Sequence, residues 1–71
     1  MANAIELYDV VALVNDVPNQ GLIRGQVGTV VHVHGAEVFE VEFSDNDGHA
    51  YALLPLRSEQ LLVLHHEPVP A

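Results

Sequence analysis

The sequence contains no cysteine and no lysine, and Arg24 and Arg57 are its only strongly basic residues. The absence of cysteine excludes disulfide bridges and thiolate chemistry, so this chain of 71 residues must be held by a dense apolar core or by association with another chain. Ten acidic residues against two basic ones give a formal net charge of -8, which repels phosphate backbones and anionic membrane surfaces. We therefore expect neither nucleic acid nor a membrane as a partner.

Long apolar runs are also absent. No stretch approaches the roughly 20 apolar residues that span a bilayer, and residues 1–7 have neither the basic nor the apolar part of a secretory signal. These absences predict a cytoplasmic protein. Because the hydrophobic content of 49% is sufficient for one small core, we expect a single domain over residues 1–71, ordered over about 5–65, with a C-terminal tail at 66–71.

Glycine and proline divide the chain into short valine-rich pieces, which favour strands over helices. The fourth piece is expected to end at Pro55, because proline cannot donate a hydrogen bond to a sheet, and Ser58 is expected to cap a single helical turn before the last strand. The pattern predicts five strands, over residues 9–14, 27–34, 37–43, 49–54 and 61–65.

The third of these segments alternates most strictly between apolar and charged side chains. Its alternation places Phe39, Val41 and Phe43 on one face, which we expect in the core, and Glu40 and Glu42 on the other. Five short strands with one helical turn before the last predict an all-β fold, a small five-stranded partly open barrel.

A resemblance to a known family supports this fold. The segments "LYDVVALVNDVPNQGLIRGQVGTVVHV", "FEVEF" and "ALLPLRSEQL", within residues 7–63, resemble a family of short bacterial proteins of unknown function with an SH3-like barrel. The "GxxGTV" pattern at residues 25–30 is also similar to the start of the KOW motif of SH3-like barrels. The resemblance implies an SH3-like barrel and brings no catalytic residue with it.

Catalytic and phosphate-binding patterns are not recognisable. Gly25 and Gly28 lead into a strand rather than a helix, and no lysine accompanies them, so a turn or bulge explains them better than a phosphate loop. The two serines, Ser44 and Ser58, lie outside any nucleophile-elbow pattern. We expect no enzyme activity and no bound cofactor.

Histidines provide an alternative function, that of a histidine-based metal-binding protein. His32 and His34 are two residues apart, so on a regular strand both imidazoles project from one face. The third ligand would be His49 in the first instance, with further candidates at Glu40, Glu42, His65 and His66. Asp45 and Asp47 fit a hairpin turn better than a calcium loop, since no acidic residue follows at the closing position.

The apolar excess lies near the C-terminus, where residues 52–64 include six leucines and a valine. Either the barrel buries them at its closure, or some stay exposed and form an interface. We expect a non-catalytic protein–protein interaction module with Tyr8, Tyr51, Leu54 and Leu56 as contacts. Its acidic surface predicts a protein partner with a basic surface, in an adaptor, accessory-subunit or antitoxin-like role, and homodimerisation is the other possible association.

Overall fold

The computed structural model describes residues 5–65, and the predicted tail, residues 66–71, lies outside the described residues. Within them the chain forms five strands and two single 3-10 turns, and η2 lies directly before the last strand. The all-β fold with five strands is therefore confirmed. In chain order the elements are β1 (Val10–Leu13), η1 (Pro18–Gln20), β2 (Val27–Val33), β3 (Val38–Ser44), β4 (Ala50–Arg57), η2 (Ser58–Gln60) and β5 (Leu61–Val63).

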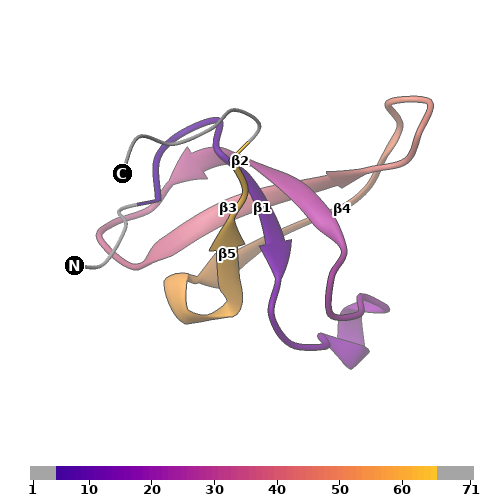
Figure 1. The fold of residues 1–71 in the computed structure, drawn as a ribbon, viewed down its shortest axis with the longest axis horizontal. Helices are drawn as coiled ribbons and strands as arrows, with labels where there is room; N and C mark the ends of the chain where they lie inside the picture. Colours follow the sequence, from indigo (N-terminus) through magenta and orange to yellow (C-terminus); the bar gives the residue numbers. More distant parts are fainter. Residues whose placement is uncertain (1–4, 66–71) are drawn as a thin grey trace.

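All strand pairs are antiparallel, and together they make one sheet that is not closed, in the order β4-β3-β2-β1-β5. The last strand therefore lies beside the first, as Figure 1 shows. Residues from both edge strands share one core, so the sheet curls on itself. The core residues are Val11, Leu13, Leu22, Val30, Phe39, Val41, Phe43, Leu54, Leu56 and Leu61.

The alternation predicted for β3 is confirmed. Phe39, Val41 and Phe43 are buried, while Glu40 and Glu42 between them lie on the outer face and are half-buried. Successive side chains of a strand point to opposite faces, so one strand supplies three large apolar groups to the core and keeps its carboxylates in contact with water.

The predicted end of the fourth strand at Pro55 is wrong, because β4 continues to Arg57. Ser58 donates its backbone N–H to the Glu37 carbonyl of the neighbouring segment, whereas the Arg57 N–H points the other way and donates to Gln60 Oε1 at 2.8 Å. Pro55 is two residues before Arg57 and so shares its outward side. Since β4 is an edge strand, the missing N–H of Pro55 removes no bond from the sheet.

The predicted cap at Ser58 is also wrong. Arg57 is the residue that precedes η2, and the Gln60 side chain, reaching back from the end of the turn, accepts its N–H. Ser58 is instead the first residue of the turn, and its carbonyl accepts the Leu61 N–H that ends it. The side chain of a glutamine three residues after the N-cap residue can accept the backbone N–H of that residue. Here Gln60 does so, and the Ser58 hydroxyl has no part in the cap.

The turn role predicted for Gly25 is confirmed, whereas Gly28 lies inside β2 at neither a turn nor the bulge. Gly25 adopts a φ of 93°, in the left-handed region that favours glycine, just before β2 begins. Gly28, inside β2, has an ordinary φ but faces the core, where an added Cβ would lie 2.7 Å from Val41 Cγ1 and 2.8 Å from the Glu42 carbonyl oxygen. Backbone conformation requires the first glycine and close packing requires the second.

Candidate functional site

Tyr8 is the most exposed large apolar side chain among the described residues, at 71% of its full accessible surface. It lies in a turn of residues 6–9, which the Asp9 N–H closes by donating to the Glu6 carbonyl at 3.1 Å. As the third residue of this turn, Tyr8 adopts a φ of 72°. Tyr8 was predicted as a contact residue, and the structure places it on the surface.

The backbone fastens this turn to β2. Tyr8 donates its N–H to the Val30 carbonyl at 2.7 Å, and Val30 donates its own N–H to the Asp9 carbonyl at 2.9 Å. The Glu6 N–H in turn donates to Asp9 Oδ2 at 2.9 Å. The exposed ring therefore projects from a backbone that hydrogen bonds hold on both sides.

Tyr51, the second predicted aromatic contact, is only half exposed and lies over the end of the core. Its ring centroid is 6.4 Å from that of Phe43, and its hydroxyl oxygen accepts a hydrogen bond from Gln26 Nε2 at 3.0 Å. The side chain joins β4 to the residue before β2. Tyr51 thus stabilises the fold in addition to presenting one face to solvent.

Leu54 and Leu56 are wrong as predicted surface contacts. They are 8% and 3% exposed, because both belong to the face of β4 that packs on the core. Their neighbour Leu53 points outward and is 57% exposed. Of the two alternatives for the leucines of residues 52–64, the structure supports partial exposure, at Leu53 and Leu62.

Leu62 contributes to an apolar row on the outer face of the sheet. Ala12 of β1 pairs with Leu62 of β5 on one side and with Val27 of β2 on the other. Leu62 and Val27 are each about half exposed, and Ala12 between them is buried. We name these three residues the β1 row. It provides a second apolar surface, distinct from the turn of residues 6–9.

The histidines predicted as ligands are not gathered in one place. His32 and His34 lie together after a bulge in β2, with ring centroids 4.7 Å apart, and His34 Nε2 lies 2.6 Å from Glu40 Oε1. His49 lies beyond the opposite end of β3, a strand of seven residues that spans roughly 20 Å. One metal ion therefore cannot take His49 as the third ligand of His32 and His34. His66, a further candidate, lies outside the described residues.

His49 instead belongs to the hairpin between β3 and β4, with Asp45 and Asp47. Each residue offers a ligand atom within 4.8 Å of the others, and all three side chains are exposed. The Asp45 Oδ1 atom accepts the backbone N–H groups of both Asp47 and His49, each at 2.9 Å. The turn role predicted for these aspartates is therefore confirmed, and the sequence did not reveal that His49 joins them.

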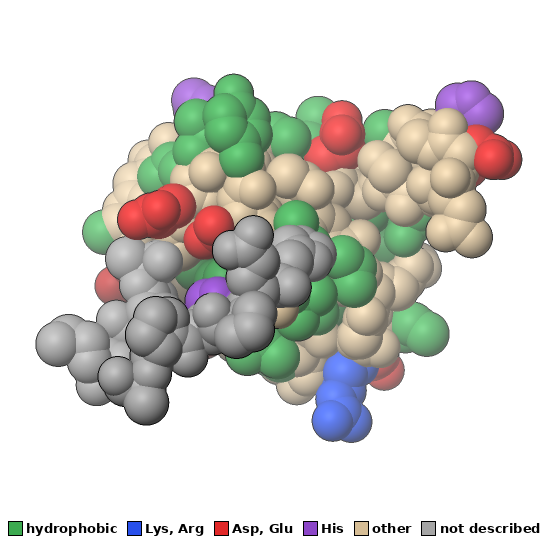
Figure 2. Space-filling model, turned by 45° about the horizontal axis from the view of Figure 1, so that its top comes forward, with side chains coloured by type: hydrophobic (Ala, Val, Ile, Leu, Met, Phe, Trp, Pro, Cys, Tyr) green, Lys and Arg blue, Asp and Glu red, His purple; other side chains and the backbone are tan. Residues whose placement is uncertain are grey.

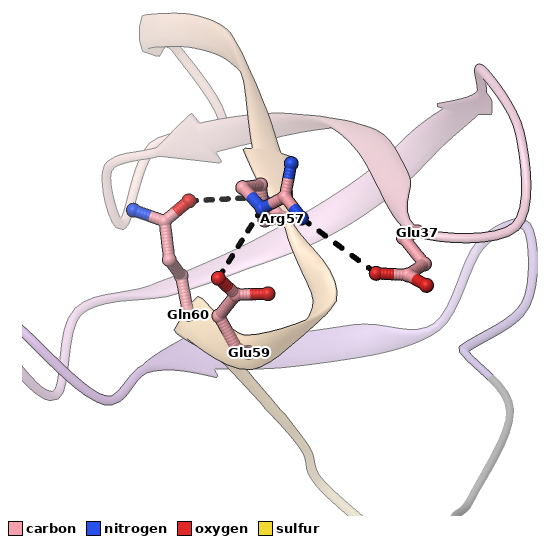
Figure 3. Close-up of polar contacts among 4 residues, drawn as sticks. All are labelled: Glu37, Arg57, Glu59 and Gln60. Atoms are coloured by element: carbon pink, nitrogen blue, oxygen red, sulfur yellow. Dashed lines mark hydrogen bonds and ion pairs between the residues drawn. The ribbon is translucent and has the colours of Figure 1, made fainter.

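One of the two arginines, Arg57, forms ion pairs with glutamates of its own chain (Figure 3). Arg57 Nε lies 3.2 Å from Glu59 Oε2, and its Nη2 atom lies 3.7 Å from Glu37 Oε1. The other, Arg24, forms no ion pair with any residue that the structure describes, and its backbone N–H donates to Asp16 Oδ1. Two cations against ten carboxylates leave the surface acidic, and Figure 2 shows acidic side chains spread between hydrophobic groups.

The model of a family described as "Domain of unknown function (DUF4926)" matches residues 7–63. The chain belongs to this family. The DUF4926 match includes Tyr8, all five strands of the described region, and Arg57 with its partners Glu37 and Glu59. The predicted resemblance to a family of unknown function is confirmed, while its SH3-like and KOW-like parts stay predictions.

Neither the curated proteins nor the solved structures include a match to this DUF4926 chain. Over residues 5–65, the structure has no helix with the length and apolar character needed to cross a membrane. The same residues contain no buried polar or charged side chain.

Proposed function

We propose that this protein is a non-catalytic protein-interaction module, a small SH3-like barrel that docks on a partner with a basic surface. The observation that carries the proposal is the number of large apolar side chains left exposed on so small a fold. Exposed apolar groups framed by polar ones are typical of protein interfaces. Among the described residues they are Leu7, Tyr8, Ile23, Val27, Val33, Tyr51, Leu53 and Leu62.

Charge supports a basic partner. The formal net charge is -8, and Arg57, one of only two arginines, is paired with Glu37 and Glu59 of its own chain. An excess of carboxylates raises the association rate with a cationic surface and disfavours anionic ones. The same excess argues against RNA or DNA as the ligand, in spite of the KOW-like turn, because a nucleic-acid site needs clustered lysine or arginine.

Such a module acts as an adaptor, an accessory subunit or an antitoxin-like partner of a larger protein in the cytoplasm. Homodimerisation is the competing association. It would use the β1 row rather than strand pairing at β4, since Pro55 has no N–H to donate on that edge and the Arg57 N–H is taken by Gln60. Small domains of this size often gain stability by association.

Affinity purification from the native host tests the proposal. We expect one stoichiometric protein with a basic surface, retained at low salt and released as the salt concentration rises. A preparation treated with nuclease serves as the control, because a nucleic-acid bridge would be lost with it. Retention of no protein, or of protein only while nucleic acid is intact, would contradict the proposed function.

Histidine-based metal binding is the alternative, and one observation favours it. Asp45, Asp47 and His49 offer three ligand atoms close together, while His32 and His34 form a separate pair at the far end of β3. Three exposed ligands on one hairpin favour weak, non-selective binding of divalent ions over a closed structural site. Calorimetric titration with zinc distinguishes the alternatives, since a tight stoichiometric site would favour the metal-binding function.

A further inference from the structure

Tyr8 occupies a backbone conformation that its residue type disfavours. The turn of residues 6–9 is closed by the hydrogen bond from the Asp9 N–H to the Glu6 carbonyl, and its third residue has a φ of 72°. This is the geometry of a type II turn, in which glycine or asparagine ordinarily takes the third position. A Cβ in the left-handed region crowds the neighbouring carbonyl, so tyrosine makes this turn less stable than glycine would.

The fold gains little from the ring in return. Tyr8 is 71% exposed, and the aromatic pairs in the described part of the chain join His32 with His34 and Phe43 with Tyr51. Tyr8 is the one non-glycine residue of that part with a positive φ. Among residues 5–65 its side chain forms no hydrogen bond and no aromatic pair that would offset the strain. A strained position with a largely exposed side chain is typical of a residue that serves function.

The surroundings of the ring define the chemistry of a partner. Leu7, beside it in the turn, is also exposed, and the two apolar side chains are flanked in sequence by Glu6 and Asp9. An apolar tip between two carboxylates is complementary to an apolar pocket bordered by arginine or lysine. A cation at the rim of that pocket could also approach the electron-rich face of the tyrosine ring.

The turn is ready to bind without rearrangement. Backbone hydrogen bonds connect Tyr8 and Asp9 to Val30 of β2 at 2.7 and 2.9 Å, and Val30 itself is buried in the core. A tyrosine has few rotatable bonds, so fixing its ring in a pocket costs little conformational entropy. The β1 row differs from the turn in that all three of its side chains are aliphatic and none is aromatic.

We propose that the turn of residues 6–9 is the docking element of this protein and that Tyr8 is its anchor. The partner is a protein that receives the ring in an apolar pocket bordered by arginine or lysine side chains. This inference rests on the proposed function and specifies which of the exposed surfaces performs it.

Site-specific photo-crosslinking in cells of the native host tests it. The full chain carries p-benzoylphenylalanine in place of Tyr8, and matched variants carry it in place of Ile23 or Leu62, which are 63% and 56% exposed. We expect position 8 to crosslink one protein with a yield roughly tenfold above the two controls, as for a residue at the centre of an interface. The crosslinked peptide should lie in a segment with arginine or lysine on both sides.

Each other outcome overturns the inference in a different way. Crosslinks from position 23 or 62 but not from position 8 would reject the docking element and leave the proposed function intact. Crosslinks from position 8 to a second copy of the chain would replace the partner by a homodimer, and a crosslinked segment rich in acidic residues would reject the basic pocket. Crosslinks from none of the three positions would contradict the proposed function together with the inference.

Discussion

Gly28 of β2 lies directly opposite Phe43 of β3, and a Cβ on Gly28 would come within 3.0 Å of the phenylalanine ring. On its other side Gly28 pairs with Val11 of β1. The absence of a side chain at this one position leaves room over β2 for the side chains of Val41 and Phe43. The backbone of Gly28 is thus part of the core packing.

Replacement of Gly28 by alanine should therefore destabilise the domain. The added methyl group would lie 2.8 Å from the Glu42 carbonyl oxygen, which belongs to the sheet and cannot move aside cheaply. We expect a loss of about 1–3 kcal/mol in the free energy of unfolding, the usual cost of overpacking a core. Urea denaturation followed by circular dichroism measures it.

Gly35→Ala is the matched control, because Gly35 has nothing within 4 Å of an added Cβ and no positive φ. Its unfolding free energy should stay within about 0.5 kcal/mol of that of the unmodified protein, as for most surface changes. If both alanine variants unfolded at the same urea concentration, the close packing described for Gly28 would be wrong.

The two neighbouring leucines of β4 offer a second test of which face is buried. Leu54 is in the core and Leu53 is 57% exposed. We expect Leu54→Ala to cost about 2–4 kcal/mol, because it leaves a cavity, and Leu53→Ala to cost less than about 0.5 kcal/mol. Comparison of the two unfolding midpoints is the measurement, and a larger effect at Leu53 would reverse the assigned orientation of β4.

The burial pattern of β3 could be predicted from the sequence because glutamate alternates there with phenylalanine and valine. The apolar side chains then lie on the core face and the charged ones on the solvent face. In β4 the corresponding run, "AYALLPLR", has apolar residues on both faces of the strand. Its sequence therefore does not distinguish Leu54 and Leu56 from Leu53. The register with β3, which pairs Leu54 with Val41, decides which leucines are buried. That information is tertiary, which is why Leu54 and Leu56 were wrongly predicted as surface contacts.

The burial of Leu22 and the backbone conformation of Tyr8 could not be predicted from the spacing of residues in the sequence. Leu22, in the long loop between β1 and β2, reaches the core because Val17 and Leu22 form a bridge that folds the loop back. Tyr8 could be identified as an exposed aromatic residue, yet its positive φ has no signature in the letters, since that turn position ordinarily holds glycine. The arrangement of strands was the more predictable part because it follows from local pattern.

The correction at η2 leads to a prediction about capping. Gln60 Oε1 accepts the Arg57 N–H at 2.8 Å, so Gln60→Ala would leave this donor to water and should cost about 0.5–1.5 kcal/mol, the usual contribution of one hydrogen bond. Ser58→Ala, at the position first expected to cap the turn, should change the unfolding free energy by less than about 0.5 kcal/mol. The reverse order of the two effects, measured by thermal denaturation, would restore serine as the cap.

The separation of the histidines leads to a prediction about metal binding. His32 and His34 lie at one end of β3 and His49 at the other, so no single zinc ion contacts all three. We expect His49→Ala to abolish any zinc binding at the hairpin while leaving binding at His32 and His34 unchanged, and His32→Ala to do the opposite. Titration calorimetry on untagged protein, with the double variant, should show additive losses, as for independent sites. Loss of all zinc binding in both single variants would indicate one shared site.

The strain at Tyr8 leads to the prediction with the clearest consequence for function. Tyr8→Gly and Tyr8→Ala both remove the ring, and only glycine also relieves the positive φ of 72°. We expect the glycine variant to be more stable than the alanine variant by about 1–2 kcal/mol, the cost of the left-handed conformation for a residue with a Cβ. In a domain of this size each kcal/mol of stability shifts Tm by roughly 4–8 °C. Differential scanning calorimetry resolves a shift of that size.

Comparison with the unmodified protein completes that test. If tyrosine is retained at position 8 for docking rather than for folding, Tyr8→Gly should be at least as stable as the unmodified chain and should lose its partner. Tyr51→Ala is the contrasting variant: its ring packs near Phe43 and its hydroxyl accepts a hydrogen bond from Gln26, so it should lose stability. A Tyr8→Gly variant less stable than the unmodified protein would show that the ring supports the fold, and the argument from uncompensated strain would fail.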